Sequence, residues 1–437
     1  MLPPVTFDPR SFEWTASTAN FLSIPLLNGI FHTLVAPISN LIIVRFLLEF
    51  VLFQASVACI GFLSVELSFI VFGGLFVSFL AITQRSQRRL YPKPDQRPWV
   101  VTMFRSNLML IVVTLITAAD HYNFPYGNHK SEGYGYALMD IGVGLFTCAN
   151  GIVRHRPKGN YFTRLWRTFV GLRQLWFWGL VRLYIVVVGG YYQPLSEYGR
   201  HGNFFLIIAI VRMVRQILDI DQRALVAVLG VVMTLHEYAI QCTGLAPWVF
   251  NGRRTGLLAI NAEFFLCVLG SLPIILFAEI VGDDIKSTPV RDYTARARSY
   301  ARTASVVALL SVWLSPPSRQ LGSPSYGLLQ LATMLMSLAI LMMADCRRRK
   351  GCWSFTIAQI GKHQLYVFMM ANFLTGAINT KFDPMHAGWG RTALIMLVYH
   401  SILALVEWLA PLWAWGWGKA RFLAKQAMMW TAWLVLG

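Results

Sequence analysis

The chain has 437 residues, of which 56% are hydrophobic and only 13% charged, and its formal net charge is +18. Soluble domains carry about 25% charged residues, so this composition excludes a set of soluble domains and indicates a multi-pass membrane protein. Nucleic acid is not an expected partner, because the basic residues lie in short clusters between apolar runs and are typical of orientation-setting loops.

At the N-terminus the sequence does not predict a cleavable signal peptide. Asp8, Arg10 and Glu13 lie where such a peptide would have a basic start and a short apolar core. Residues 19–437 are expected to form one membrane domain, and residues 1–18 a luminal N-terminal segment if an odd number of helices precedes Arg85. Residues 19–83 are apolar with few breaks, which is enough for about three helices at roughly 20 residues per span.

Apolar runs of spanning length continue along the rest of the chain. They predict helices near residues 100–119, 134–153, 169–189, 203–219, 224–246, 259–280, 301–315, 326–345, 357–379 and 391–414. Together with the first three, they predict an all-α, polytopic transmembrane bundle of about 13 helices. The sequence leaves the oligomeric state open.

The distribution of basic residues predicts the orientation of this bundle. One alternating set of loops holds 19 basic residues and the opposite set holds six. The richer set lies within residues 85–97, 154–167, 286–302 and 347–350. The positive-inside rule places these loops in the cytosol. Three polar segments then emerge together on the other face: His121 to Glu132, Gln193 to Asn203, and Asn372 to Lys381.

The most informative segment runs from Tyr134 to Gly151, where Asp140 and Asn150 interrupt an apolar run long enough to cross a bilayer. A charge near hydrocarbon costs several kcal/mol unless it faces a cavity or a partner, so Asp140 is a candidate functional residue. A helix cap is the competing interpretation. The residues from Tyr134 to Met139 are themselves predicted to be helical, so Asp140 would lie inside the helix and not at its cap. We therefore expect Asp140 to be a general base or a substrate anchor.

A second polar cluster lies in the sequence SEYGRHGNFF, which gathers Glu197, Tyr198, His201 and Asn203 within a few residues. Histidine titrates near neutral pH and is the commonest general base, so His201 is the better proton acceptor of this group. An interfacial loop with a capping asparagine and a belt tyrosine is the alternative.

Three weaker features remain. Glu263, inside an apolar run, is expected to form a structural ion pair. Asn372, Thr375 and Asn379 share one helix face, a pattern more often used for contacts between helices than for binding. Lys130 lies in a polar loop on the non-cytosolic face, where solvation alone can explain a charged side chain. No metal site or resident cofactor is indicated, because the sequence has no CxxC, HExxH, GxSxG, Walker or dinucleotide motif.

Several of these motifs occur together in a known order and spacing. They are RPW from Arg97, AAD ending at Asp120, FP from Phe124, KSEGYG from Lys130, MDIGVGLF from Met139, EYGRHGNFF from Glu197, NAEFF from Asn261, SRQLGSPSYG from Ser318 and MANFLTGAIN from Met370. With them the chain resembles the glycosylphosphatidylinositol (GPI) inositol acyltransferase family from about Arg97 to Asn379. Members of that family acylate the inositol of glucosaminyl-phosphatidylinositol from acyl-CoA.

The resemblance implies a membrane-bound O-acyltransferase of the endoplasmic reticulum, with acyl-CoA, glucosaminyl-phosphatidylinositol and membrane lipids as partners. Acyl-CoA is then a co-substrate and no resident cofactor is needed. The expected base is Asp140, or His201 as its alternative or partner, and Asn150 and Asn203 are expected hydrogen-bond donors. The remaining expected substrate-binding residues are Lys130, Glu197, Tyr198 and Asn372.

The chain departs from the family pattern at a few positions. Val187 and Pro194 replace a lysine and a histidine, Gly202 replaces a tryptophan, and NAEF from Asn261 replaces NREG. These departures leave open a diverged enzyme with altered lipid preference, or a catalytically inactive paralogue that acts as a membrane scaffold. A lipid transporter or flippase is a separate alternative; it would show paired half-repeats with broken helices, and the sequence shows none.

Overall fold

The computed structural model describes residues 11–34, 47, 49–85, 98–154, 158–190, 193–219, 222–252, 254–346 and 355–406. Every regular element within these residues is a helix, which confirms the all-α prediction. The basic residues at 86–97 and 347–350, and the last part of the predicted span 391–414, lie outside the described residues.

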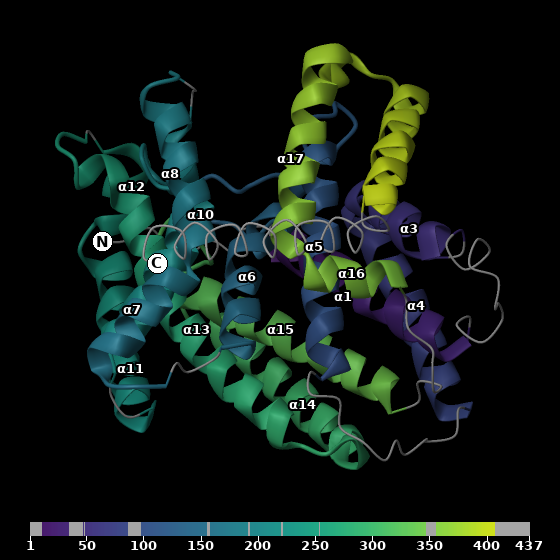
Figure 1. Ribbon diagram of the computed structural model, residues 1–437, viewed down its shortest axis with the longest axis horizontal. Helices are drawn as coiled ribbons and strands as arrows, with labels where there is room; N and C mark the ends of the chain where they lie inside the picture. The colour runs from purple at the N-terminus through teal and green to yellow at the C-terminus, as the bar shows by residue number, and fades with distance from the viewer. Residues whose placement is uncertain are drawn as a thin grey trace, which may run out of the picture.

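Three long helices form a slanted layer through the middle of the molecule (Figure 1). They are α13 (Ala262–Ser287), α14 (Tyr293–Ser311) and α15 (Pro324–Asp345). The start of α15 follows from its sequence: Pro324 takes the first helical position, where its missing N–H is not needed, and the hydroxyl of Ser323 accepts from the Tyr326 N–H at 3.4 Å.

Helix α6 (Ile141–Ile152) packs closely against α13. Gly151 makes this possible, because a Cβ there would lie 2.6 Å from the Cβ of Ala278, and Gly282 is similarly tight against the Ile152 backbone. Small residues at a helix interface let two backbones approach each other. The approach fixes α6, and with it the segment that carries Asp140 at its N-terminal end.

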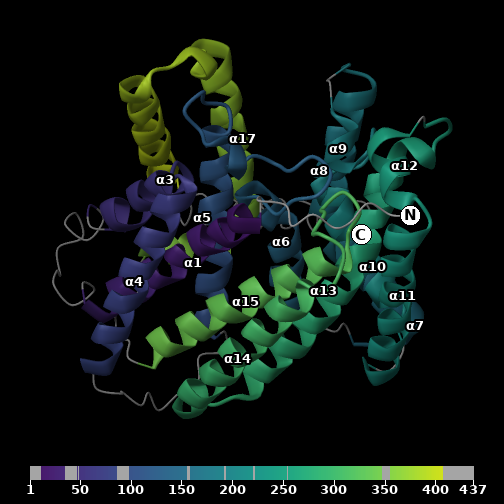
Figure 2. The same cartoon turned by 180° about the vertical axis from the view of Figure 1, so that it is seen from behind.

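Two groups of helices lie on either side of this layer, as the view from behind shows (Figure 2). One group comprises α1 (Ser11–Leu34), the π-helix Phe50–Ala55, α3 (Ser56–Gly61), α4 (Val65–Arg85), α5 (Trp99–Ala118), α16 (Phe355–Lys362), α17 (Gln364–Lys381) and the helix Trp389–Val406. The other comprises α7 (Tyr161–Gly171), α8 (Arg173–Val187), α9 (Leu195–Tyr198), α10 (Phe204–Ile217), α11 (Gln222–Cys242) and α12 (Leu245–Asn251). Short 3-10 turns lie at Tyr126–Asn128, Leu138–Asp140, Ala259–Asn261, Val290–Asp292 and Pro384–His386.

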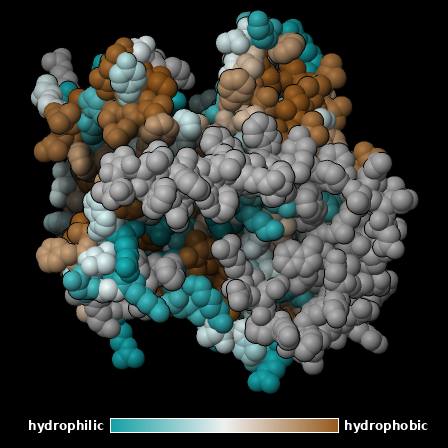
Figure 3. All heavy atoms as spheres, viewed as in Figure 1, coloured by the Kyte–Doolittle hydropathy of each residue, from teal (hydrophilic) through white to brown (hydrophobic). Residues whose placement is uncertain are grey.

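Apolar side chains gather on the two upper protrusions of the molecule, one over α8 and the other over α17 and the helix that follows it (Figure 3). Phe177 and Leu180 of α8 are well exposed, as are Phe373 of α17 and Leu394 beyond it. An aqueous surface rarely carries apolar patches of this extent. These surfaces have the composition of lipid-facing ones.

Within the described residues, six helices are long and apolar enough to cross a membrane, and α7 with α8, bent by 54°, gives a seventh if the pair counts as one span. The predicted number of about 13 is not confirmed. Several predicted spans are shorter helices: α6 has 12 residues and α10 has 14. At 1.5 Å per residue they rise about 18 and 21 Å, against a hydrocarbon core of about 30 Å.

Candidate functional site

A cavity of about 740 Å³ lies between the two groups of helices. Its lower wall is apolar and comes from α1, α5, α6, α10 and α17, with Leu108, Ile111, Phe146, Phe204 and Phe368 among the lining residues. Its polar wall comes from the loop between α5 and α6, from residues 193–198 and from Arg319. The three polar segments predicted to emerge on one face contain, in order, Lys130, Glu197 and Asn372. All three line this one cavity, which confirms that the segments lie together.

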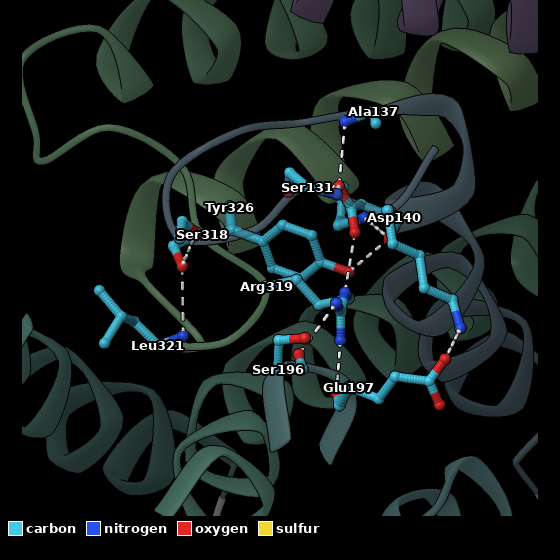
Figure 4. A network of polar contacts seen from close by, with 12 residues as sticks. Ser131, Ala137, Asp140, Ser196, Glu197, Ser318, Arg319, Leu321 and Tyr326 are labelled. Carbon is cyan, nitrogen blue, oxygen red and sulfur yellow. Dashed lines mark hydrogen bonds and ion pairs between the residues drawn. The ribbon is translucent and has the colours of Figure 1, made fainter. Parts of the chain in front are cut away.

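The ion pair between Arg319 and Asp140 is the most buried polar feature beside the cavity (Figure 4). Arg319 Nε donates to Asp140 Oδ1 at 2.8 Å, and the two side chains are 2% and 0% exposed. Arg319 also donates to the backbone oxygens of Glu197, at 2.5 Å, and Ser196, at 3.2 Å. The Arg319 guanidinium lies 5.3 Å from the centre of the Tyr198 ring. Arg319 lines the cavity and fixes residues 196–198 along it.

Asp140 itself lies behind Arg319 and does not line the cavity. Its Oδ2 atom accepts from the Ser131 N–H at 3.0 Å, the Ser131 hydroxyl at 2.6 Å and the Ala137 N–H at 3.1 Å. With four donors on one carboxylate, no side of the group is open to a substrate hydroxyl. The geometry therefore argues against the predicted role of base and gives Asp140 the role of positioning Arg319.

The segment that precedes Asp140 is fixed against the loop that carries Arg319. The Gly135 N–H donates to Pro317 O at 2.7 Å, and the Ser318 hydroxyl donates to Gly133 O at 2.7 Å. From α15, the Tyr326 hydroxyl donates to Asp140 O at 2.8 Å. These contacts join residues far apart in the sequence into one rigid support.

Lys130 and Glu197 form a second ion pair, this one on the cavity wall, with Lys130 Nζ 2.5 Å from Glu197 Oε1. Burial works to raise the pKa of Glu197. The Lys130 ammonium, with smaller contributions from Arg319 and Arg182, outweighs burial and holds this pKa below its ordinary value. The carboxylate of Glu197 is therefore charged near neutral pH and orients Lys130.

Asp120, two residues after the end of α5, is one of three acidic residues that line the cavity, together with Glu132 and Glu197. The Asn379 amide of α17 donates to its Oδ2 at 2.7 Å, and among the described residues its Oδ1 has no hydrogen-bond partner. His129 also lines the cavity. Burial lowers the pKa of His129, although Asp120 works in the opposite direction, so this imidazole is neutral near pH 7.

The second predicted base, His201, does not line the cavity. The backbone N–H of His201 donates to Asn261 Oδ1 at 2.8 Å, and the Nδ1 atom of its ring lies 3.0 Å from Asn261 Nδ2. Asn203 does line the cavity, but both polar atoms of its amide are hydrogen-bonded to backbone groups. Its Oδ1 accepts from the Leu206 N–H at 3.1 Å, and its Nδ2 donates to Gly179 O at 2.9 Å. The capping interpretation of Asn203 is confirmed.

Asn150 lies at the far end of α6 from Asp140 and outside the cavity wall. Its amide donates to Phe146 O at 2.9 Å and accepts from Arg212 Nη1 at 3.3 Å. Asn372 lines the cavity, and its amide donates to Phe368 O at 2.7 Å. Of the predicted site residues, Lys130, Glu197, Tyr198, Asn203 and Asn372 are thus brought together, whereas Asp140, Asn150 and His201 are not on the wall.

Two structural predictions are confirmed. Glu263 pairs with Arg254 at 2.6 Å, and both side chains are buried. The polar face of α17 contacts α5, because the hydroxyls of Thr375 and Thr117 lie 2.5 Å apart and Asn379 donates to Asp120.

The departure at Gly202 has a steric cause. A Cβ at Gly202 would overlap the carbonyl oxygen of Tyr198 and come within 2.9 Å of the Phe264 Cβ. The backbone therefore has no room for the tryptophan that the family pattern carries. Pro194 lines the cavity, whereas Val187 lies at the end of α8 with 56% of its surface exposed.

The cavity has the chemistry of a site for an amphiphile. The polar part of the lining holds three cations, Lys130, Arg182 and Arg319, and three acidic residues, Asp120, Glu132 and Glu197. The cations can bind a phosphate-bearing head group, and the apolar wall accommodates hydrocarbon. Its volume falls within the roughly 300–1,000 Å³ of small-molecule sites. No group of metal-ligating side chains occurs within the ranges that the structure describes.

Known proteins match most of the chain. The chain is 29% identical to GPI-anchored wall transfer protein 1 of Schizosaccharomyces pombe over 72% of its length and 73% of the relative. It is 22% identical to the phosphatidylinositol-glycan biosynthesis class W protein of Dictyostelium discoideum, over 84% of the chain and 86% of the relative. GPI-anchored wall transfer protein 1 of Aspergillus oryzae is 26% identical over 71% and 72%. The GWT1 family model matches residues 13–410. The chain therefore belongs to the GWT1 family, the GPI inositol acyltransferase family that its motifs resemble.

Proposed function

We propose that this protein transfers an acyl chain from acyl-CoA to an inositol hydroxyl of glucosaminyl-phosphatidylinositol in GPI-anchor biosynthesis. The observation that carries the proposal is the cavity, which combines an apolar wall, a polar lining with three cations and an acidic group with a free oxygen, Asp120. Family membership supports the reaction class, and the apolar and charged parts of the cavity suit an acyl chain and a phosphate.

In the proposed reaction, Asp120 Oδ1 accepts the proton of the attacking inositol hydroxyl. The new ester C–O bond forms as the thioester C–S bond breaks, and the proton passes to the departing thiolate of CoA. A positioned base of this kind contributes about 10²–10⁴-fold to a rate. Asn379, which binds the other oxygen of Asp120, orients the carboxylate.

The three cations that line the cavity have two roles in this proposal. Lys130, held by Glu197, stabilises the negative charge that develops on the thioester oxygen. Arg182 and Arg319 attract the phosphate of the lipid head group. Asp140 is a positioning residue, because it orients Arg319 without touching the cavity. The apolar wall excludes water, which protects the thioester from hydrolysis.

The same proposal includes the cellular setting. The protein resides in the membrane of the endoplasmic reticulum with its basic loops in the cytosol and about 13 spans. The polar wall of the cavity then faces the lumen, where the glycolipid head group is presented. Acyl-CoA is the co-substrate and the enzyme carries no resident cofactor.

The direct test is acyl transfer by the purified protein from radiolabelled palmitoyl-CoA to glucosaminyl-phosphatidylinositol, with the product resolved by chromatography. We expect a labelled product that mild alkali cleaves as an inositol ester. Phosphatidylinositol without the amino sugar serves as the acceptor control. Movement of unmodified glycolipid across proteoliposomes without acylation would instead support a transporter, and neither acylation nor movement would support a scaffold.

A further inference from the structure

A second, smaller cavity of about 460 Å³ lies beside the first. It is lined by Glu132, Tyr134, Ser196, Phe250, Asn251 and Gln320 among others. Glu132 and Ser196 also line the larger cavity, so the two cavities share part of a wall. The two cavities are therefore immediate neighbours.

Gln320 gives the clearest sign that this second cavity receives a ligand. The residue is only 4% exposed and lines the cavity, yet among the described residues its side-chain amide has no hydrogen-bond partner. Buried amides in native proteins are nearly always paired, and an unpaired one costs about 1–3 kcal/mol. A ligand with hydroxyl groups would satisfy it.

The backbone around Gln320 is held in place on both sides. Arg319 makes the ion pair with Asp140, and Leu321 O accepts from His236 Nε2 at 2.8 Å. The backbone that carries Gln320 is therefore held in place before any ligand binds, which reduces the entropy lost on binding.

The other side chains indicate which class of ligand fits. The hydroxyl of Ser196 and the amide of Asn251 add neutral donors and acceptors, and the rings of Tyr134 and Phe250, 5.2 Å apart and edge to face, add an aromatic wall. Neutral polar groups beside an aromatic surface suit a sugar ring, whose hydroxyls hydrogen-bond and whose C–H faces pack on aromatic rings. Glu132 is the one acidic side chain among the lining residues, and it suits an ammonium group.

We propose that this second cavity binds the glucosamine ring of the glycolipid, with the Glu132 carboxylate recognising its ammonium group and Gln320 its hydroxyls. The inference rests on the proposed function, which supplies the glycolipid, and deepens it by naming the part of the molecule that sets specificity. The phosphate and inositol then lie at the shared wall, and the acyl chains lie in the larger cavity. A sugar whose amine is acetylated has no charge for Glu132 and adds bulk, so the site selects the free amine.

The test is a binding measurement that needs no acyl transfer. Short-chain glucosaminyl-phosphatidylinositol and its N-acetylated form are each titrated by calorimetry into the purified full-length protein, without any acyl donor. We expect the wild type to bind the amine form about 10-fold more tightly, which corresponds to about 1.4 kcal/mol. Glu132→Gln should abolish that preference, and Gln320→Leu should weaken binding of both forms about 10-fold.

Two further variants control the experiment. Asp383→Asn makes the same change of charge at an exposed position after α17 and should bind as the wild type does. Asn251→Ala, at an exposed lining position, should weaken binding even if Gln320→Leu impairs folding. Soluble glucosaminyl-inositol is expected to compete for the site, and its failure to compete would overturn the assignment.

The outcomes separate this inference from the proposed reaction. Amine-selective binding that is lost in Glu132→Gln, in a protein that transfers no acyl chain, would retain the sugar site and reject the reaction. Acyl transfer with unchanged affinity and unchanged amine preference in all three pocket variants would retain the reaction and overturn the sugar site. A wild type with equal affinity for both forms would also overturn it.

Discussion

Arg319 and Asp140 lie 179 residues apart in the sequence and form an ion pair of 2.8 Å that is buried beside the larger cavity. A buried pair of this kind contributes little net stability compared with apolar residues, but removal of one partner leaves an uncompensated charge and costs about 3–5 kcal/mol. Since the backbone oxygens of Ser196 and Glu197 also bind Arg319, loss of the pair would release part of the cavity wall.

A double-mutant cycle tests this arrangement. Asp140→Ala and Arg319→Ala should each destabilise the fold by about 3–5 kcal/mol, whereas the double variant should lose less than the sum because no lone charge remains. Thermal unfolding of the purified proteins in detergent measures the effect. Additive losses would show that the two charges do not depend on each other.

Asp120→Asn separates the base from the positioning residue. The variant should lower kcat about 10²–10⁴-fold and leave the unfolding temperature unchanged, because Asp120 is partly exposed and takes part in one side-chain hydrogen bond. Asp383→Asn, an exposed acid after α17, is the matched control and should retain full activity. A normal kcat in Asp120→Asn with none in a folded Asp140→Asn would return the role of base to Asp140.

The Lys130–Glu197 pair should make stability depend on pH. Burial raises the pKa of Glu197 but Lys130 lowers it further, so the folded value lies below the ordinary 4.5. The pair therefore stabilises the fold fully above about pH 4.5, and this contribution is lost as the pH falls through the lower folded pKa. The effect should be at most about 1 kcal/mol, since the Lys130 side chain is 35% exposed.

Unfolding temperatures at about pH 6 and pH 3.5 measure this contribution. The decrease between the two values should be smaller in Glu197→Gln than in the wild type, because the variant has no carboxylate to protonate. Equal decreases in the two proteins would show that the pair adds no stability.

Gly202 should not tolerate the side chain that the family pattern carries there. Gly202→Ala is expected to lower the unfolding temperature, and Gly202→Trp to prevent folding, because even a Cβ would overlap the Tyr198 carbonyl. Gly230→Ala, on α11 with open space around it, should be neutral or stabilise by about 1 kcal/mol. An active Gly202→Trp variant would mean that residues 198–202 adopt a different backbone.

The sequence predicted those features of the fold and site that depend on local pattern. Apolar runs and polar loops of known spacing were enough to expect helices, to place Lys130, Glu197 and Asn372 on one face, and to expect an ion pair at Glu263. A buried acid needs a partner wherever it lies, so the need for a partner was predictable although its identity, Arg254, was not.

What the sequence could not predict depends on contacts between distant segments. Arg319 is one of the six basic residues of the poorer loop set, and no local pattern indicates that it folds against Asp140; its place in the motif SRQLGSPSYG was the one signal. Asp120 was marked only as the end of the motif AAD. The predicted count of about 13 spans stays unconfirmed. Within two of the predicted spans, hydropathy does not indicate the bend at Leu172 or the break at His363.

The apolar surfaces of α8 and α17 have a consequence for how a substrate arrives. Both helices contribute residues to the cavity, Arg182 from one and Phe368 from the other, and both expose apolar side chains on their outer sides (Figure 3). A lipid that entered the cavity sideways between them would keep its tails in hydrocarbon throughout. Extraction into water would cost about 0.8 kcal/mol for each methylene group. Lateral entry avoids that barrier, so the encounter rate should follow the two-dimensional concentration of the glycolipid rather than its solubility.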